Sequence, residues 1–168
     1  MLNLSSPSIN KVDEALIPNL PFNIVIEKIL NYEQIVTIFS QICAIPASDI
    51  RVTNEDFDII ITSDNLQLEC QVCQTAGEFN TMIVLWSDSK IVQKNVLAIG
   101  SIVDVGRKVS QACFCKCLVS STLDEDNADD AYYLVDQNTV PKVVLLDPYA
   151  IEDDIYKILK EDPKRSRL

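Results

Sequence analysis

Residues 66–86, LQLECQVCQTAGEFNTMIVLW, decide the fold. Apolar and polar side chains alternate over residues 66–74, and apolar and β-branched side chains fill residues 79–86. A period of two is typical of β-strands, and the short TAGE segment between the runs is typical of a turn, so we predict two antiparallel strands. The other side of the first strand is polar and should face water or a partner. The core side of this strand should carry Leu66, Leu68, Cys70 and Val72.

The segments that precede this pair predict one more strand and a helix. Residues 57–62 are rich in β-branched side chains and should complete an antiparallel meander of three strands. Asn31 and Gln34 have the spacing of a capping box, and apolar residues then follow at helical intervals. This pattern predicts a helix that ends near Ala44, with an earlier start near Asn23 as an alternative.

The second half of the chain predicts two helices and three strands. Residues 94–110 carry apolar side chains at helical spacing and should pack on the sheet. Residues 113–120 should form a fourth strand, and residues 132–135 and 142–146 should form a hairpin. A last helix is predicted from one apolar stripe, which consists of Ile151, Ile155, Ile158 and Leu159.

The predicted element order is α-β-β-β-α-β-β-β-α. It defines an α+β fold in which an antiparallel β-sheet, made of a meander plus a C-terminal hairpin, packs against helices. Residues 1–20 lack a sustained period and should form an N-terminal arm. Residues 21–162 should form a single α+β domain, and residues 163–168 a basic C-terminal tail.

Composition and charge restrict the class of partner. The chain has 168 residues, of which 48% are hydrophobic, and a formal net charge of -11. This composition is typical of a folded globular protein. A negative field repels phosphate backbones and anionic lipid headgroups, so we expect neither nucleic acid nor a membrane as a partner. The N-terminus does not resemble a signal peptide, and we expect a cytoplasmic protein with reduced cysteines.

Half of the six cysteines alternate along one short segment, namely Cys113, Cys115 and Cys117. We interpret them as small apolar side chains on the buried face of one strand, which they share with Val119. Phe114, Lys116 and Leu118 should then lie on the opposite face.

Zinc binding and redox chemistry are the alternatives for the cysteines. Cys70 and Cys73 have the spacing of a zinc knuckle, and the alternating cysteines could complete the ligand set. In a strand, however, residues three apart point to opposite faces. A redox Cys-x-x-Cys motif needs the start of a helix, whereas this one lies in a predicted strand. We therefore expect no metal and no cofactor.

A pair of carboxylates gives another alternative. Asp58 and Glu69 lie on the predicted meander, as in metal-dependent nucleases of the Asp…Glu-x-Lys type, but Gln71 replaces the lysine. The chain contains no histidine, which excludes Ser-His and Cys-His nucleophile pairs. We therefore predict no catalytic residues.

Aromatic residues and an acidic run suggest a surface for a basic protein. Trp86 ends its predicted strand, and one of two adjacent tyrosines in the hairpin should point outward. Aromatic side chains anchor partners, and carboxylates steer them to the surface. The predicted partner-binding residues are Asp124, Glu125, Asp126, Asp129, Asp130, Tyr132, Tyr133 and Trp86.

The element order over roughly residues 25–160 resembles that of bacterial type III secretion chaperones, and several immunity proteins of toxin systems are also small acidic α+β chains. The resemblance implies a protein that escorts or neutralises another protein. Our first hypothesis is a non-enzymatic, cytoplasmic, acidic protein-binding module. This hypothesis is compatible with a homodimer. The alternative is a metal-dependent or thiol-dependent enzyme that uses the cysteines or the Asp58 and Glu69 pair.

Overall fold

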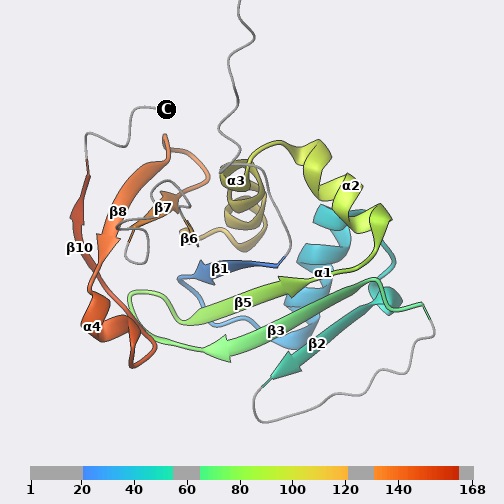
Figure 1. Ribbon diagram of the computed structural model, residues 1–168, viewed down its shortest axis with the longest axis horizontal. Coiled ribbons are helices and arrows are strands. Elements are labelled where there is room, and N and C mark those ends of the chain that lie inside the picture. Colours follow the sequence, from blue (N-terminus) through green and yellow to red (C-terminus); the bar gives the residue numbers. More distant parts are fainter. Residues whose placement is uncertain (1–20, 55–64, 121–130, 163–168) are drawn as a thin grey trace, which may run out of the picture.

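The structure is a computed structural model that describes residues 21–54, 65–120 and 131–162. Its main sheet has eight strands in the order β10-β8-β7-β6-β1-β5-β3-β2, and three helices pack on one side of it (Figure 1). The helices are α1 (Tyr32–Cys43), α2 (Lys90–Ile99), α3 (Ile102–Cys113) and the short α4 (Pro148–Ile151), with a 3₁₀ turn η2 (Ala47–Asp49). The strands of the main sheet are β1 (Phe22–Ile26), β2 (Ile50–Asn54), β3 (Leu68–Gln74), β5 (Thr81–Trp86), β6 (Cys117–Ser120), β7 (Ala131–Val135), β8 (Lys142–Leu146) and β10 (Ile158–Glu161). Two short strands, β4 (Ala76–Gly77) and β9 (Ile155–Tyr156), form a separate parallel pair.

The α+β class is confirmed, with a sheet that is mixed but mostly antiparallel. The pairing of β3 with β5 and that of β7 with β8 follow the prediction. Only β2 and β3 run parallel among the described strands of the main sheet. The predicted strand 57–62 lies outside the described residues, and the neighbour of β3 is β2.

Strand β1 lies in the centre of the sheet, between β5 and β6, which the sequence analysis did not predict. The alternative start of the first helix near Asn23 is therefore wrong. The apolar side chains of Phe22, Ile24 and Ile26 are buried toward the helices, and Val25 is buried on the other side. Burial on both sides removes the alternation that marks a half-exposed strand.

Helix α1 begins where the capping box predicts. The Asn31 side chain accepts a hydrogen bond from the Gln34 backbone N–H, and the Gln34 side chain accepts one from the Asn31 N–H, each at 2.9 Å. The helix ends at Cys43, and its C-cap residue Ala44 adopts a left-handed conformation before Pro46. The two orphan donors at its start are thus satisfied within the chain.

The single helix predicted over residues 94–110 is wrong, because two helices, α2 and α3, occupy this region. Gly100 separates them with a φ of 122°, a conformation that L side chains rarely adopt. Ser101 then caps α3 through a second capping box with Asp104. The apolar spacing continues across this break, which is why the periodicity alone suggested one helix.

The predicted last helix is also wrong. Asp147 caps only one helical turn, α4, and the chain then enters β9 and β10. Ile158 pairs with Leu146 at the edge of the main sheet, while Tyr156 is buried against its second side. Of the apolar stripe, Ile151 and Ile158 pack against the smaller core, whereas Ile155 and Leu159 are exposed.

Two apolar cores lie on opposite sides of the sheet. The larger one fills the space between the sheet and helices α1, α2 and α3. The smaller one consists of Val25, Phe79, Leu118, Val144, Leu146 and Tyr156. The second core lies only on part of the sheet, and the region around β2 and β3 remains half-exposed on that side.

Gly106 sets how closely α3 approaches the sheet. A Cβ at this position would lie 2.9 Å from Cγ1 of Val119 and 3.4 Å from Cγ2 of Val135. We expect Gly106→Val to lower the free energy of unfolding by about 1–3 kcal/mol through overpacking. Urea unfolding followed by tryptophan fluorescence measures this change. Ala112→Val, at an exposed position of the same helix, is the control, and equal losses for the two variants would contradict this packing.

In the part of the chain that the structure describes, no helix combines the length and the apolar character needed to cross a bilayer. The predicted arm, residues 1–20, and the predicted basic tail, residues 163–168, lie outside the described residues.

Candidate functional site

The side of the sheet away from the helices carries the candidate site, which we call the open face. Its residues alternate with buried ones along β2, β3 and β5 and are half-buried or exposed. The strand register places Trp86 opposite Glu69 and Glu69 opposite Arg51, and in the next row Val84 opposite Gln71 and Gln71 opposite Thr53. The open face comprises Arg51, Thr53, Glu69, Gln71, Val84 and Trp86. The prediction that one side of the meander is polar is therefore confirmed.

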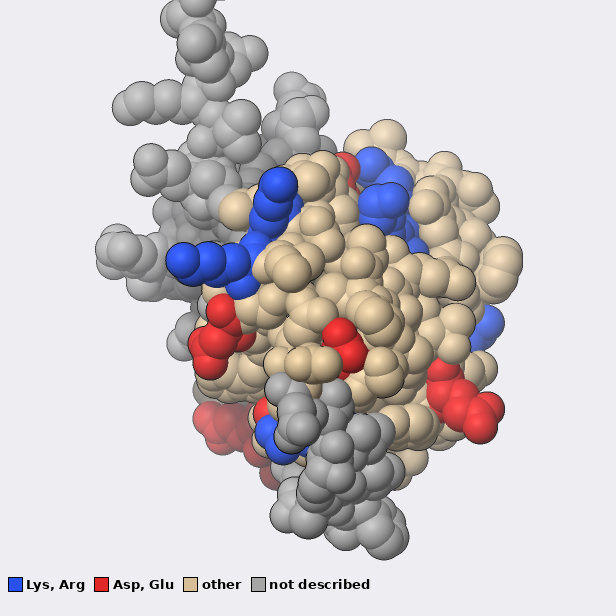
Figure 2. Space-filling model, turned by 90° about the vertical axis from the view of Figure 1, so that its right-hand side faces the viewer, with Lys and Arg blue, Asp and Glu red and all other residues tan. Residues whose placement is uncertain are grey.

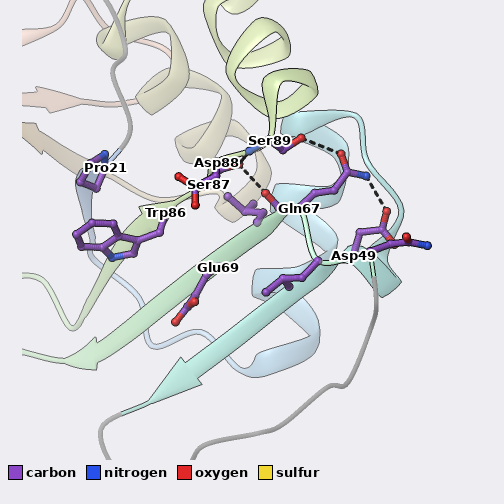
Figure 3. A pocket seen from close by; sticks show the side chains of 11 residues that line it. Pro21, Asp49, Gln67, Glu69, Trp86, Ser87, Asp88 and Ser89 are labelled. Atoms are coloured by element: carbon purple, nitrogen blue, oxygen red, sulfur yellow. Dashed lines mark hydrogen bonds between the residues drawn. The ribbon is translucent and has the colours of Figure 1, made fainter.

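Trp86 stands at one end of the open face, beside a groove of about 800 Å³. Its side chain is 47% exposed, although it is the largest apolar group on this side of β5. Figure 3 shows Trp86 and Glu69 on neighbouring strands, with Pro21 close to the indole. The groove lies where the chain enters β2 and β3 and leaves β5.

A hydrogen-bond network holds the wall of the groove (Figure 3). The Gln67 amide donates to the Asp49 carboxylate at 2.7 Å and accepts from the Ser89 hydroxyl at 3.1 Å. The Ser87 hydroxyl donates to the Gln67 backbone carbonyl at 2.5 Å. These contacts tie the entries to β2, β3 and α2 together, so the groove is built on a fixed frame.

The groove is acidic. Its lining includes the carboxylates of Asp49, Glu69 and Asp88, and no lysine or arginine is among the described residues that line it. Glu69 accepts a hydrogen bond from the Arg51 guanidinium, an ion pair that neutralises part of this charge. Asp49 and Asp88 have no cationic partner among the ion pairs of the described residues. The groove therefore favours a positively charged group.

The side of the molecule that carries α2 shows a different charge pattern. Figure 2 shows acidic and basic side chains as separate spots on a mostly uncharged surface there. Two apolar side chains of α2, Ile91 and Leu97, are exposed. The described residues on that side form no broad acidic patch, so the groove is the better candidate for a basic ligand.

The structure separates the predicted partner-binding residues. Trp86 is exposed at the groove, whereas Tyr133 is fully buried in the larger core. Tyr132 points to the other side and packs edge-on against Tyr156, with ring centroids 6.4 Å apart. Its ring is half-buried and lies on β7, three strands away from β5. The acidic residues Asp124, Glu125, Asp126, Asp129 and Asp130 lie outside the described residues.

The three alternating cysteines do not share one strand, so that prediction is wrong. Cys113 ends α3, Cys115 follows the left-handed residue Phe114, and only Cys117 lies in β6. The helix extends further than predicted, to Cys113, and the buried Ser110 hydroxyl donates to the Cys115 carbonyl beyond its end. The burial of all three cysteines is nevertheless confirmed.

Burial has the largest effect on the pKa values of three thiols, those of Cys43, Cys70 and Cys117. Desolvation raises the pKa of Cys43 to about 12 and raises the pKa values of Cys70 and Cys117 well above the ordinary range. Cys70 faces the larger core and Cys73 lies on the other side of β3. None of the six cysteines, all of which lie among the described residues, forms a disulfide, and the described residues contain no group of three or more His, Cys, Asp or Glu side chains arranged to hold a metal.

Of the two carboxylates in the alternative hypothesis, only Glu69 lies among the described residues. Asp58 lies outside the described residues, and Glu69 is paired with Arg51 and lies within 3.4 Å of the Thr53 hydroxyl. The Glu69 carboxylate is therefore already paired with a cationic side chain of the neighbouring strand.

The groove residues Asp49, Gln67, Ser87 and Ser89 did not emerge from the sequence analysis. Ser89 caps α2, and a Ser-x-Ser segment after a strand was the available signal for that helix start. The other contacts join segments about 20 residues apart, which no local pattern reveals.

No protein-family model, no curated protein and no solved structure matches this chain.

Proposed function

We propose that this chain is a non-enzymatic protein-binding module that engages a basic partner through Trp86 and its groove. The observation that carries the proposal is the exposed indole of Trp86 on a strand of the central sheet. It stands beside a groove that is lined by carboxylates and, among the described residues, by no lysine or arginine. Large aromatic side chains on a rigid support lose little entropy on binding and are frequent anchors of interfaces.

The groove suits an arginine or lysine side chain of the partner. A guanidinium over the indole would gain a cation–π contact, and Asp49 and Asp88 would supply charge-assisted hydrogen bonds. Glu69 could exchange part of its contact with Arg51 for one with the partner. The polar row formed by Gln71 and Thr53 extends this surface along the open face.

The net charge of -11 adds long-range steering toward a basic surface. The five carboxylates between Asp124 and Asp130 would contribute to that field. An inhibitor of a basic enzyme, such as an immunity protein, or a secretion chaperone in the cytoplasm would act in this way. The fixed frame of the groove favours binding without large rearrangement.

We expect Trp86→Ala to weaken binding to a partner that co-purifies with the tagged wild-type chain by at least about 30-fold, the effect of losing an anchor worth about 2 kcal/mol. Binding is measured by calorimetry with the purified partner. Tyr149→Ala removes an aromatic side chain on α4 that is even more exposed, 82% against 47% for Trp86, and is the control.

Because Trp86 is the only tryptophan of the chain, its fluorescence reports directly on the groove. The emission should change when the partner is added, and association should slow as salt rises. An acidic partner, an unchanged emission on binding, or equal affinities of wild type and Trp86→Ala would contradict the proposal.

A further inference from the structure

One row of side chains crosses the open face from β2 to β5. The register places Arg51 opposite Glu69 and Glu69 opposite Trp86, and β3 lies between the other two strands. Neighbouring strands are about 4.8 Å apart, so the side chains of one row lie within reach of each other. Glu69 therefore has a cation on one side and an indole on the other.

Glu69 is the shared member of this row. Glu69 and Trp86 both line the Trp86 groove, whereas Arg51 is not among the lining residues. Arg51 reaches Glu69 from β2, and the two side chains are 35% and 31% exposed. A cation that enters the groove thus meets a carboxylate whose charge is already partly neutralised by Arg51.

The ion pair between Arg51 and Glu69 is a contact through one nitrogen of the guanidinium. Nη2 of Arg51 donates to Oε2 of Glu69. Nε of Arg51 is buried and has no hydrogen-bond acceptor among the described residues. The other oxygen of Glu69, Oε1, accepts a long hydrogen bond of 3.4 Å from the Thr53 hydroxyl. A guanidinium that donates two parallel N–H groups to a carboxylate binds it more strongly than this single contact does.

We propose that Arg51 is an internal competitor for an arginine of the partner and that it sets the affinity and the selectivity of the Trp86 groove. This inference rests on the proposed function, because it concerns the same groove. In the free chain, Arg51 holds Glu69. In the complex, the partner's guanidinium stacks on Trp86 and donates two N–H groups to Glu69, and Arg51 gives up its hydrogen bond to that carboxylate.

The competition favours arginine over lysine in the partner. A guanidinium is planar, stacks on an indole and matches both oxygens of a carboxylate. An ammonium group makes no such two-point contact, so it displaces Arg51 from Glu69 less effectively. We therefore expect the groove to discriminate between the two cations as long as Arg51 is present.

The first test uses the full-length chain and N-acetyl-tetraarginine amide as the probe, at low ionic strength. Binding is followed by the fluorescence of Trp86, the only tryptophan of the chain. Arg51→Met keeps an apolar side chain at this position and removes the charge. This variant should bind the probe about three-fold more tightly than wild type, the effect expected of one half-exposed ion pair. Unchanged or weaker binding would overturn the proposal.

A matched control separates this effect from the change in net charge. Arg107 also forms an ion pair, with Asp104, and its side chain is 39% exposed, but it lies on α3, on the other side of the sheet. Arg107→Met should change the affinity for the probe much less than Arg51→Met does. Arg51→Lys keeps a charge beside Glu69 and should bind like wild type. Equal gains in Arg51→Met and Arg107→Met would overturn the proposal.

A double-mutant cycle tests whether Arg51 acts through Glu69. Glu69→Gln should weaken binding of the probe, because it removes the shared carboxylate. In the Glu69→Gln background, Arg51→Met should give no more gain than Arg107→Met gives. Exposed ion pairs contribute little to stability, so all of these variants should keep the native circular dichroism. An equal gain from Arg51→Met in both backgrounds would show that Arg51 does not act through Glu69.

N-acetyl-tetralysine amide tests the selectivity. Wild type should bind this probe more weakly than the tetraarginine probe, because an ammonium group competes poorly with Arg51. The ratio of the two affinities should narrow in Arg51→Met, in which Glu69 is open to either cation. A ratio that stays the same would overturn the role of Arg51 in selectivity.

Calorimetry with Trp86→Ala distinguishes a failure of this inference from a failure of the proposed function. If Trp86→Ala binds the tetraarginine probe as tightly as wild type, or if wild type does not bind it, the groove is not the binding site and both proposals are wrong. If Trp86→Ala loses binding but Arg51→Met gains none, only the role assigned to Arg51 is wrong.

Discussion

Replacing Phe39 by alanine should lower the free energy of unfolding by about 3–5 kcal/mol, the cost of removing a buried aromatic ring and leaving a cavity. Phe39 lies on α1, is 0% exposed and belongs to the larger core. The loss is a large share of the total stability of an ordinary domain, which is 5–15 kcal/mol. Urea unfolding at 25 °C, followed by circular dichroism, measures it.

Phe114→Ala provides the matched control, because the same ring is removed from a side chain that is 73% exposed. Both residues then become alanine, and alanine accepts the left-handed backbone at position 114 no worse than phenylalanine does. We expect this variant to lose less than about 1 kcal/mol. Similar losses in the two variants would contradict the packing of α1 on the sheet.

The stability of the native state should fall steeply above pH 9. The buried thiols of Cys43, Cys70 and Cys117 keep their protons in the native state, whereas the same thiols ionise in the unfolded chain near the ordinary pKa of 9.0. Below pH 9 both states are protonated and the free energy of unfolding is unaffected. Above pH 9 the unfolded state binds fewer protons, so each such thiol lowers the free energy by up to about 1.4 kcal/mol per pH unit.

Cys43→Ala isolates the contribution of one thiol, because its pKa is raised to about 12 by burial alone. Urea midpoints of wild type and variant are compared from pH 8 to 11 in the presence of a reductant. The curves should approach each other as the pH rises, because the variant loses stability less steeply. Curves that stay parallel over this range would mean that Cys43 ionises in the native state as readily as in the unfolded chain.

Local signals predicted several elements of this fold correctly. The capping box of Asn31 and Gln34 places the start of α1, and the alternation over residues 66–74 identifies the buried and polar sides of β3. In both cases the deciding contacts lie within a few residues of each other. The exposed position of Trp86 at a strand end follows from the same alternation.

Other elements depend on contacts between distant segments. β1 is a strand because β5 and β6 cover its two edges, and nothing within its five residues requires this. The apolar residues after Asp147 have helical spacing. In the structure, however, Tyr156 is buried in the smaller core and Ile158 pairs with Leu146 of β8. The alternating cysteines resembled a strand, but Cys113 belongs to α3, and the Ser110 hydroxyl of that helix bonds to the Cys115 carbonyl in the turn that follows.

The central position of β1 has a consequence for folding during synthesis on the ribosome. This strand is synthesised first among the described elements, yet its neighbours β5 and β6 follow only after residues 81 and 117. Pairings between segments so far apart close slowly, because long loops must be ordered before their contacts form. The nascent chain must therefore carry an apolar, unpaired strand until residues 117–120 have emerged, and the middle of the sheet is completed only after that point.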